Sequence, residues 1–286
     1  MTDRVITSTD ERRPAILEII RNARRSIALS LFRCNDDEIF AELARATARG
    51  VFVEALITSR AKGGKKKLQK LHDALERGGA TVYAYTEPVV KYHAKYIVAD
   101  EGPAVVASFN FTRKCFAKTC DALVVTHDPA VVAGLRALHG ADRKRGPLPG
   151  TVPSRLIIGP ERARKQFTAL LEQATSSIRL IDAKLSDPDL VTLLNARREA
   201  GLTVDVFSSK RLGDLKSHGK MLLVDDRVAV IGSLALAAIS LDFRREVAII
   251  VEDPQGVADV KRLFETIDAV PTRGRIGFAD GEELAL

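Results

Sequence analysis

Residues 93–110 decide the fold, and their sequence is His93-Ala-Lys95-Tyr-Ile-Val-Ala-Asp100-Glu-Gly-Pro-Ala-Val-Val-Ala-Ser108-Phe-Asn110. Two short apolar runs flank the turn-forming residues Asp-Glu-Gly-Pro, a pattern that predicts a β-hairpin. Because side chains alternate between the two faces of a strand, His93 and Lys95 share one face, as do Ser108 and Asn110. The stretch therefore predicts four polar side chains gathered on one patch.

The pattern occurs a second time, 125 positions later (218 − 93). The recurring residues are a histidine, a lysine, an aspartate and a serine, and the second set is His218, Lys220, Asp225 and Ser233. The same offset separates the carboxylates Asp121 and Glu246. A register kept over so many positions indicates an internal duplication.

On the N-terminal side of each motif the duplication continues with a different offset. Ser26 corresponds to Ser177 and Gly50 to Gly201, an offset of 151, so 26 residues (151 − 125) of the first half lack a counterpart. We expect the additional residues to be about 59–85, which form a lysine-rich loop, a helix and a strand.

The spacing of apolar residues predicts an α/β chain. Helices are expected over 14–25, 37–49, 161–174 and 188–200, and strands over 26–32, 51–57, 177–181 and 202–207. A segment rich in proline, glycine and charge, 141–153, is the natural linker, so we place the two halves at 1–145 and 154–286. Two similar halves are expected to pack about a pseudo-twofold axis, as a homodimer would.

Composition indicates an ordinary globular protein, with 46% hydrophobic and 28% charged residues. Three cysteines without framework spacing favour reduced thiols, and the N-terminus lacks the apolar region of a secretion signal, so a cytoplasmic location is expected. No apolar run is long enough to span a membrane. The net charge of +7 favours an anionic partner such as nucleic acid, anionic lipid or another phosphate-rich surface. The glycine-rich signature of a nucleotide-binding P-loop is absent, which excludes that kind of ATP or GTP site.

The paired motif resembles the phospholipase D superfamily, whose signature is two copies of H-x-K-(x)4-D-(x)6-G-S-x-N. The first copy is matched by His93, Lys95, Asp100, Ser108 and Asn110, and the second by His218, Lys220, Asp225, Gly232 and Ser233. The chain departs from the signature at Ala107, where glycine is usual, and at Ala235, where asparagine is usual. The resemblance implies the phospholipase D fold, with two α/β/α halves, mixed sheets and one active site at their interface.

The chemistry of these residue types suits attack on a phosphodiester. Such a group repels nucleophiles, so a site must neutralise its oxygens and supply both a nucleophile and an acid for the leaving alkoxide. Lys95 and Lys220 provide positive charge, assisted by Asn110, Ser108 and Ser233, while two imidazoles can divide the attack and the proton transfer.

The resemblance adds specific roles to these residues. It implies a covalent phosphohistidine, with His93 as nucleophile and His218 as acid and base, although the symmetry leaves the reverse assignment open. It also implies that a downstream carboxylate orients each histidine, a role that Glu246 fits, with Asp121 as its first-half counterpart at the same spacing of 28 (121 − 93 and 246 − 218). Asp100 and Asp225 are expected to hold the hairpins together. No cofactor is expected, and no cluster of His, Cys and carboxylate has metal-ligand spacing.

The substrate stays open between three hypotheses. Nucleic acid is favoured by the basic charge and by a lysine cluster of candidate contacts, Lys62, Lys65, Lys66 and Lys67, and opposed by an aromatic content of only 5%. Phospholipid would require an exposed apolar rim, for which residues 88–90 and 234–241 are candidates. A noncatalytic nucleic-acid-binding module with a decayed site is the third hypothesis. In each case we expect a monomer whose site is pseudo-dimeric.

Overall fold

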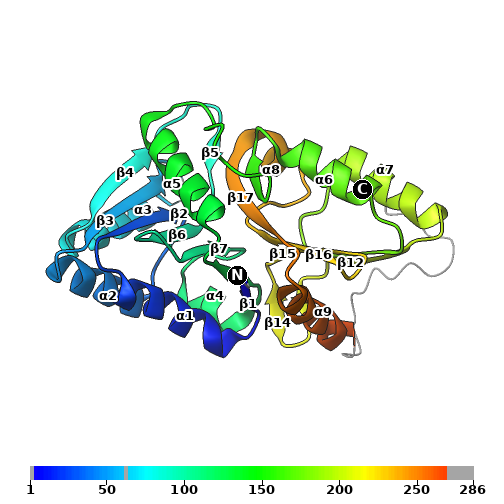
Figure 1. Cartoon of the computed structure of the whole chain (residues 1–286), viewed down its shortest axis with the longest axis horizontal. Coiled ribbons are helices and arrows are strands. Elements are labelled where there is room, and N and C mark those ends of the chain that lie inside the picture. The colour runs from blue at the N-terminus through cyan, green and yellow to red at the C-terminus, as the bar shows by residue number, and fades with distance from the viewer. Residues whose placement is uncertain (1–2, 61–63, 269–286) are drawn as a thin grey trace.

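The computed structural model describes residues 3–60 and 64–268, which form two α/β halves lying side by side (Figure 1). The first half contains β1 (Arg4–Ile6), α1 (Thr9–Asn22), β2 (Ser26–Leu31), α2 (Asp37–Ala48), β3 (Phe52–Thr58), α3 (Lys65–Arg77), β4 (Thr81–Tyr85), β5 (Lys91–Tyr92), β6 (Tyr96–Ala99), β7 (Ala104–Ala107), α4 (Arg113–Lys118), β8 (Thr119–Cys120), β9 (Leu123–Thr126) and α5 (Pro129–Lys144). The second half contains β10 (Leu156–Gly159), α6 (Ala163–Glu172), β11 (Ser177–Asp182), α7 (Pro188–Glu199), β12 (Thr203–Phe207), β13 (Arg211–Leu212), β14 (Leu215–Ser217), β15 (Lys220–Val224), β16 (Val228–Gly232), α8 (Ala238–Phe243), β17 (Arg244–Val251) and α9 (Pro254–Asp268).

The two large sheets have equivalent strand orders. The order is β1-β9-β7-β6-β2-β3-β4 in the first half and β10-β17-β16-β15-β11-β12 in the second. Both sheets are mixed, because β2–β3 and β11–β12 are parallel while the hairpin strands are antiparallel. The strand β4 has no equivalent, and together with α3 it accounts for the additional residues of the first half.

Three apolar clusters hold these layers together. The outer face of the first sheet packs against α1, α2 and α3, and that of the second sheet against α6, α7 and α8. The inner faces share one cluster that includes α5 and α9, with contributors such as Val106, Leu135, Ile231 and Phe264. The two halves therefore bury a common core, and the α/β/α halves with mixed sheets expected from the sequence are confirmed.

The first helix starts earlier and ends earlier than its apolar spacing predicted. It begins at Thr9 rather than Pro14, and the acidic residues Asp10 and Glu11 in its first turn favour this end of the helix. The earlier start places Arg12 in the core, where its guanidinium donates to backbone carbonyls that include those of Thr119 and Asp121. The helix stops at Asn22, which frees the following amides to bind a carboxylate described below.

The connection between the halves is shorter than the predicted linker. The helix α5 continues to Lys144, and the buried Asp142 near its end lies 2.9 Å from Nε of Arg245. Only residues 145–155 run between α5 and β10. The boundaries at 145 and 154 stay a prediction.

Candidate active site

Each motif forms the hairpin that its sequence predicts. In the first half β6 pairs antiparallel with β7, with Tyr96 opposite Val106, and in the second half β15 pairs with β16. His93 and Lys95 lie directly before β6, while Ser108 and Asn110 directly follow β7. The polar residues are therefore carried at the open end of the hairpin, opposite its turn.

The motif aspartates stabilise the other end of each hairpin. The carboxylate of Asp100 accepts hydrogen bonds from the amides of Arg24, Arg25 and Ser26, which precede or begin β2. Burial acts to raise the pKa of Asp100, but these amide donors outweigh it and lower the pKa. The prediction held that Asp100 fixes the hairpin itself; its contacts instead fasten the hairpin turn to the neighbouring strand.

Asp225 occupies the equivalent position with more donors. It accepts hydrogen bonds from the amides of Thr175, Ser176 and Ser177 and from the hydroxyls of Thr175 and Ser176. Burial is again outweighed by these donors, so the pKa of Asp225 is lowered. Both aspartates have positive φ, 43° for Asp100 and 54° for Asp225, a conformation that aspartate tolerates better than most residues.

The halves exchange short strands at their interface. The strand β5, directly before His93, pairs in parallel with the start of β17, so that Lys91 lies opposite Arg244. The strand β14, before His218, pairs in parallel with β8, so that Lys216 lies opposite Thr119. These two pairings are related by the 125-residue offset, and each brings a histidine of one half to the carboxylate that directly follows the paired residues of the other half.

As a result, each histidine faces the carboxylate of the opposite half. Nδ1 of His93 lies 2.5 Å from Oε1 of Glu246. Nδ1 of His218 lies 3.1 Å from Oδ2 of Asp121, at hydrogen-bonding geometry. In each case the carboxylate lies at Nδ1, so Nε2 is the ring nitrogen without a carboxylate beside it.

Different serines support the two carboxylates. Ser108 donates a hydrogen bond of 2.7 Å to Asp121, whereas Glu246 receives its hydrogen bond from Ser240. Ser233 is hydrogen-bonded to the backbone amide and carbonyl of Val247. The hydroxyls of Ser108 and Ser233 thus have partners within the protein, and the structure places both in supporting positions.

The environments of the two carboxylates differ. Burial raises the pKa of Glu246, with Lys95 opposing the shift. For Asp121, burial is outweighed by the charge of His218 and its hydrogen bond, which lower the pKa. Asp121 is therefore held as an anion beside His218.

The two lysines are anchored by the motif itself. Nζ of Lys95 donates to the carbonyl of His93 at 2.6 Å and lies 3.2 Å from its Nδ1, and Nζ of Lys220 donates to the carbonyl of His218. Lys95 is buried, and burial lowers its pKa to about 7, although Glu246 opposes the shift. A phosphate bound beside Lys95 would add a negative charge and so raise the pKa of this lysine again.

His93 is held neutral by its surroundings. Burial is the main cause that lowers its pKa well below the usual range, followed by the charges of Lys95 and Lys220. The His93 side chain is 14% exposed, compared with 30% for His218. A neutral, nearly enclosed imidazole is suited to attack, and a more open imidazole beside an anion is suited to proton transfer.

Lys184 and Arg244 belong to the site but were not predicted. Both contribute positive charge that lowers the pKa of His93, and burial lowers the pKa of Lys184 itself. One signal could have revealed Lys184: it stands 151 positions after Arg33 (184 − 33), so both halves place a basic residue just after the equivalent strand.

The departures from the signature have local explanations. At Gly232 an added Cβ would lie 2.3 Å from Cα of Ala248, which requires glycine, whereas Ala107 is accommodated opposite Leu123. The backbone amide of Ala235 donates a hydrogen bond to the hydroxyl of Ser240. In the first half, the buried Oδ1 of Asn110 has no hydrogen-bond partner in the described part of the chain, so this amide side chain has unused capacity for a ligand.

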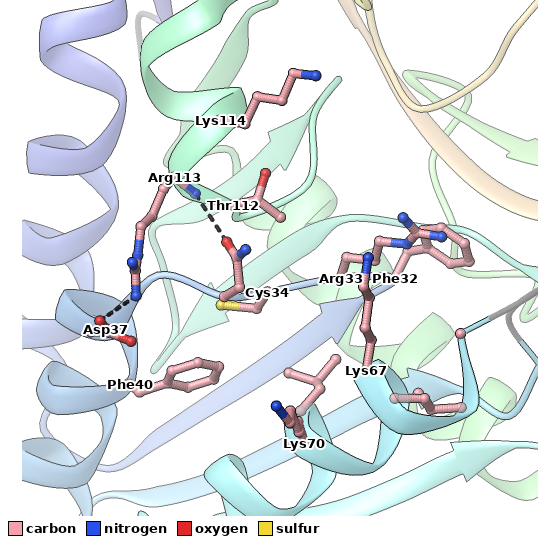
Figure 2. Close-up of a pocket in the computed structure, with 14 residues that line it drawn as sticks. Phe32, Arg33, Cys34, Asp37, Phe40, Lys67, Lys70, Thr112, Arg113 and Lys114 are labelled. Atoms are coloured by element: carbon pink, nitrogen blue, oxygen red, sulfur yellow. Dashed lines mark hydrogen bonds and ion pairs between the residues drawn. The ribbon is translucent and has the colours of Figure 1, made fainter.

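A groove adjoins the site on the first half. It has a volume of about 830 Å³ and is formed by the loop after β2 and by α2, α3 and α4 (Figure 2). Phe32 lines the groove, and its ring centroid lies 4.4 Å from that of His93. The groove therefore reaches the wall of the catalytic centre.

The predicted lysine contacts are distributed unevenly around this groove. Lys67 lines it, whereas Lys65 and Lys66 are exposed on α3 outside the lining. Lys62 lies outside the described residues.

Residues 3–60 and 64–268 contain no group of three or more His, Cys, Asp or Glu side chains that could hold a metal ion. Over the same ranges, no helix combines the length and apolar character required to cross a bilayer.

The comparisons with known proteins agree with this architecture. Two mixed sheets that join a pair of histidine–lysine motifs define a phospholipase D-like protein. A family model described as "Cardiolipin synthase, PLD-like domain" matches residues 16–139 and 199–267. The chain belongs to this family of the phospholipase D superfamily.

Individual relatives are more distant. Phospholipase D of Rickettsia bellii (strain RML369-C) is 33% identical over 113 residues, which cover 40% of this chain and 54% of that protein. The chain thus spans about half the length of this curated relative.

Two solved structures have the same fold. Polyphosphate kinase from Porphyromonas gingivalis superimposes with a TM-score of 0.75 at 20% identity, covering 92% of this chain and 46% of that one. Phosphatidylserine synthase from Haemophilus influenzae Rd KW20 gives a TM-score of 0.68 at 15% identity, covering 93% of this chain and 86% of that one. At these identities the likeness shows the fold alone.

Proposed function

We propose that the protein is a phosphodiesterase that works through a covalent phosphohistidine, with His93 as nucleophile and His218 as general acid and base. The observation that carries this proposal is the exchange of carboxylates, which gives the two histidines different surroundings. His93 is enclosed by cations and neutral, so its Nε2 lone pair is available. His218 is paired with an anionic Asp121, so it can hold the proton that a leaving group requires.

The reaction balances within these groups. Nε2 of His93 forms a bond to phosphorus while the bond to the leaving oxygen breaks, and His218 transfers its proton to that oxygen. In the second step His218 removes a proton from water, or from an alcohol, which attacks phosphorus and releases His93. In this mechanism Lys95 and Lys220 neutralise the phosphate oxygens in both steps, and the Asn110 amide donates a hydrogen bond to one of them.

Nucleic acid is the substrate class that we favour. It is supported by the net charge of +7 and by the basic groove beside His93. Phosphate backbones attract such a surface through counterion release. With protein cations supplying the charge, we expect turnover to survive a chelating agent.

Phospholipid is the second candidate, because three exposed apolar side chains lie near the exchanged strands. Val89 is 67% exposed, Ile239 56% and Phe243 51%. Val89 precedes β5 and Phe243 directly precedes β17, which pairs with β5, so these residues form an apolar rim at one edge of the interface. The family relative named phospholipase D adds support for this candidate.

One experiment tests the function and separates the substrates. The purified protein is incubated, with chelator, with single-stranded DNA, duplex DNA, RNA and phospholipid vesicles containing a short alcohol. Samples are quenched with denaturant at alkaline pH, because the phosphorus–nitrogen bond of phosphohistidine is labile in acid, and are analysed by mass spectrometry. We expect nucleic-acid fragments and a peptide in which His93 carries the phosphoryl group with the retained part of the substrate, both absent in His93→Ala. A phosphatidyl-alcohol product would replace the first candidate by the second. A protein that binds nucleic acid but turns over none of these substrates would contradict catalysis and favour a noncatalytic binding module.

A further inference from the structure

We infer that the groove between α2, α3 and α4 binds a short segment of single-stranded nucleic acid next to the scissile phosphate. This inference rests on the proposed function and deepens it, because it names the form of the polyanion that the site takes. The groove is lined by cationic side chains and by two aromatic rings, a combination that suits the backbone and the bases of one strand.

The charge of the groove is strongly one-sided. Its cationic lining residues are Arg33, Lys67, Lys70, Arg113 and Lys114. The one carboxylate in the lining, Asp37, is already paired with Arg113. Within residues 3–60 and 64–268, neither Lys67, Lys70 nor Lys114 is paired with a carboxylate, so these ammonium groups are available to phosphates.

Aromatic rings lie where the bases of a bound strand would pass. Phe40 projects from α2 toward the space between α2 and α3, and Phe32 stands at the end of the groove near His93 (Figure 2). Both rings are partly exposed. The aromatic content of the chain is low, at 5%, yet two of its phenylalanines line this one groove. Stacking on such rings is tolerant of sequence, and the scarcity of aromatics elsewhere is therefore no obstacle.

The dimensions of the groove favour one strand over two. A volume of about 830 Å³ matches sites that enclose a single small ligand. A double helix, with a major groove about 12 Å wide, binds to surfaces and projecting elements rather than inside such a space. Duplex DNA would also keep its bases stacked on one another and away from Phe40.

The second half has no equivalent groove wall. The helix α3, which supplies Lys67 and Lys70, belongs to the segment that the second half lacks. The nucleotides on the groove side of the scissile phosphate would therefore be held more tightly than those on its other side.

Binding is measured in the His93→Ala background, so the result does not depend on turnover. A fluorescent single-stranded oligonucleotide is titrated by anisotropy at several salt concentrations. Lys67→Ala/Lys70→Ala is expected to weaken binding about tenfold or more and to reduce the slope of log K against log salt by about 1.4, since each single-strand phosphate contact contributes about 0.7. Phe40→Leu keeps an apolar side chain and should weaken binding about fivefold without changing that slope.

The matched control is Lys65→Ala/Lys66→Ala, which removes the same charge from the same helix outside the groove. We expect its Kd to stay within about twofold of the parent. Equal weakening by both lysine pairs would overturn the inference in favour of diffuse surface attraction. Duplex DNA that binds as tightly as single strands would also overturn the inference. The same holds if Lys67→Ala/Lys70→Ala weakens binding to anionic vesicles but not to the oligonucleotide. Groove-dependent binding with no turnover by the intact protein would instead contradict the proposed function alone.

Discussion

The short helices α4 and α8 occupy equivalent positions in the two halves, but α4 exposes cationic side chains and α8 exposes apolar ones. Both directly precede a strand that takes part in the exchange at the interface, and they are related by the 125-residue offset. The exposed residues of α4 include Arg113, Lys114 and Lys118, whereas at the equivalent positions α8 exposes Ala238, Ile239 and Phe243. The duplication has thus kept the central chemistry while the surroundings of the two motifs have diverged, and we expect substrate selection to depend on those surroundings.

The largest expected effect separates the two histidines. His93→Ala should lower kcat by about 10⁴-fold or more, because no nucleophile remains. His218→Ala should cost about 10²- to 10⁴-fold with a natural leaving group and much less with a nitrophenyl diester, whose leaving group needs no proton.

Trapping the intermediate makes this comparison decisive. In His218→Ala, quenching with denaturant at alkaline pH should reveal the substrate's phosphoryl group on His93, since attack can occur but hydrolysis is slowed. Phosphate found on His218 in His93→Ala would reverse the assignment.

The exchanged carboxylates provide the next test. Glu246→Gln should resemble damage to His93 and lower kcat about 10²-fold without accumulation of phosphoenzyme, because Glu246 lies 2.5 Å from Nδ1 of His93. Asp121→Asn should resemble damage to His218, with a similar loss of kcat but with accumulated intermediate. Quenched-flow measurement of the phosphoenzyme distinguishes them, and identical behaviour of the two variants would count against distinct roles.

The motif aspartates should differ in their effect on stability. Asp225→Ala removes a carboxylate with backbone and hydroxyl donors and should lower the free energy of unfolding by about 2–3 kcal/mol, whereas Asp100→Ala, with three amide donors, should cost about 1–2 kcal/mol. Denaturation by urea measures both.

The pH dependence of this stability follows from the lowered pKa values. Because both aspartates have lowered pKa values in the folded protein, their contribution is present above the unfolded value near 3.9 and is lost as pH falls toward the folded value. The difference between each variant and the parent should therefore shrink below about pH 4. A difference that grew on acidification would contradict this role.

The smallest expected effect concerns Lys95. Its pKa of about 7 in the free protein means that it is cationic below this pH and loses its charge above it. We expect kcat/KM to fall by about tenfold for each unit of pH above 7, and Lys95→Arg, which stays protonated, should shift this fall to higher pH even if its maximum is lower. An unchanged alkaline limb in Lys95→Arg would assign the fall to another group.

The sequence predicted the fold well because the relevant signals were local or repeated. The hairpin of residues 96–107 follows from two apolar runs that flank a turn, and the equivalent sheets follow from the constant offsets. The start of α1 was wrong because Arg12 is buried against carbonyls more than a hundred positions away, which apolar spacing cannot reveal.

The site was predictable in its residue types but not in its partnerships. The spacing of 28 relates each histidine to the carboxylate of its own half, but the pairing of β5 with β17 brings His93 to Glu246 of the other half instead. Lys184 is a single lysine in a loop, and Phe40 has the spacing of a core residue. Their proximity to the site depends on how separate elements pack in three dimensions.

Because the two halves exchange short strands, the recovery of activity during refolding depends on the docking of the halves. His93 and Glu246 are 153 positions apart in the chain (246 − 93), and neither half can assemble a complete histidine–carboxylate pair by itself. Contacts of such long range form late, because the ends of a long loop must first be brought together. During refolding, each sheet can regain its secondary structure while the protein is still inert, and the return of activity would report the moment at which the two halves dock.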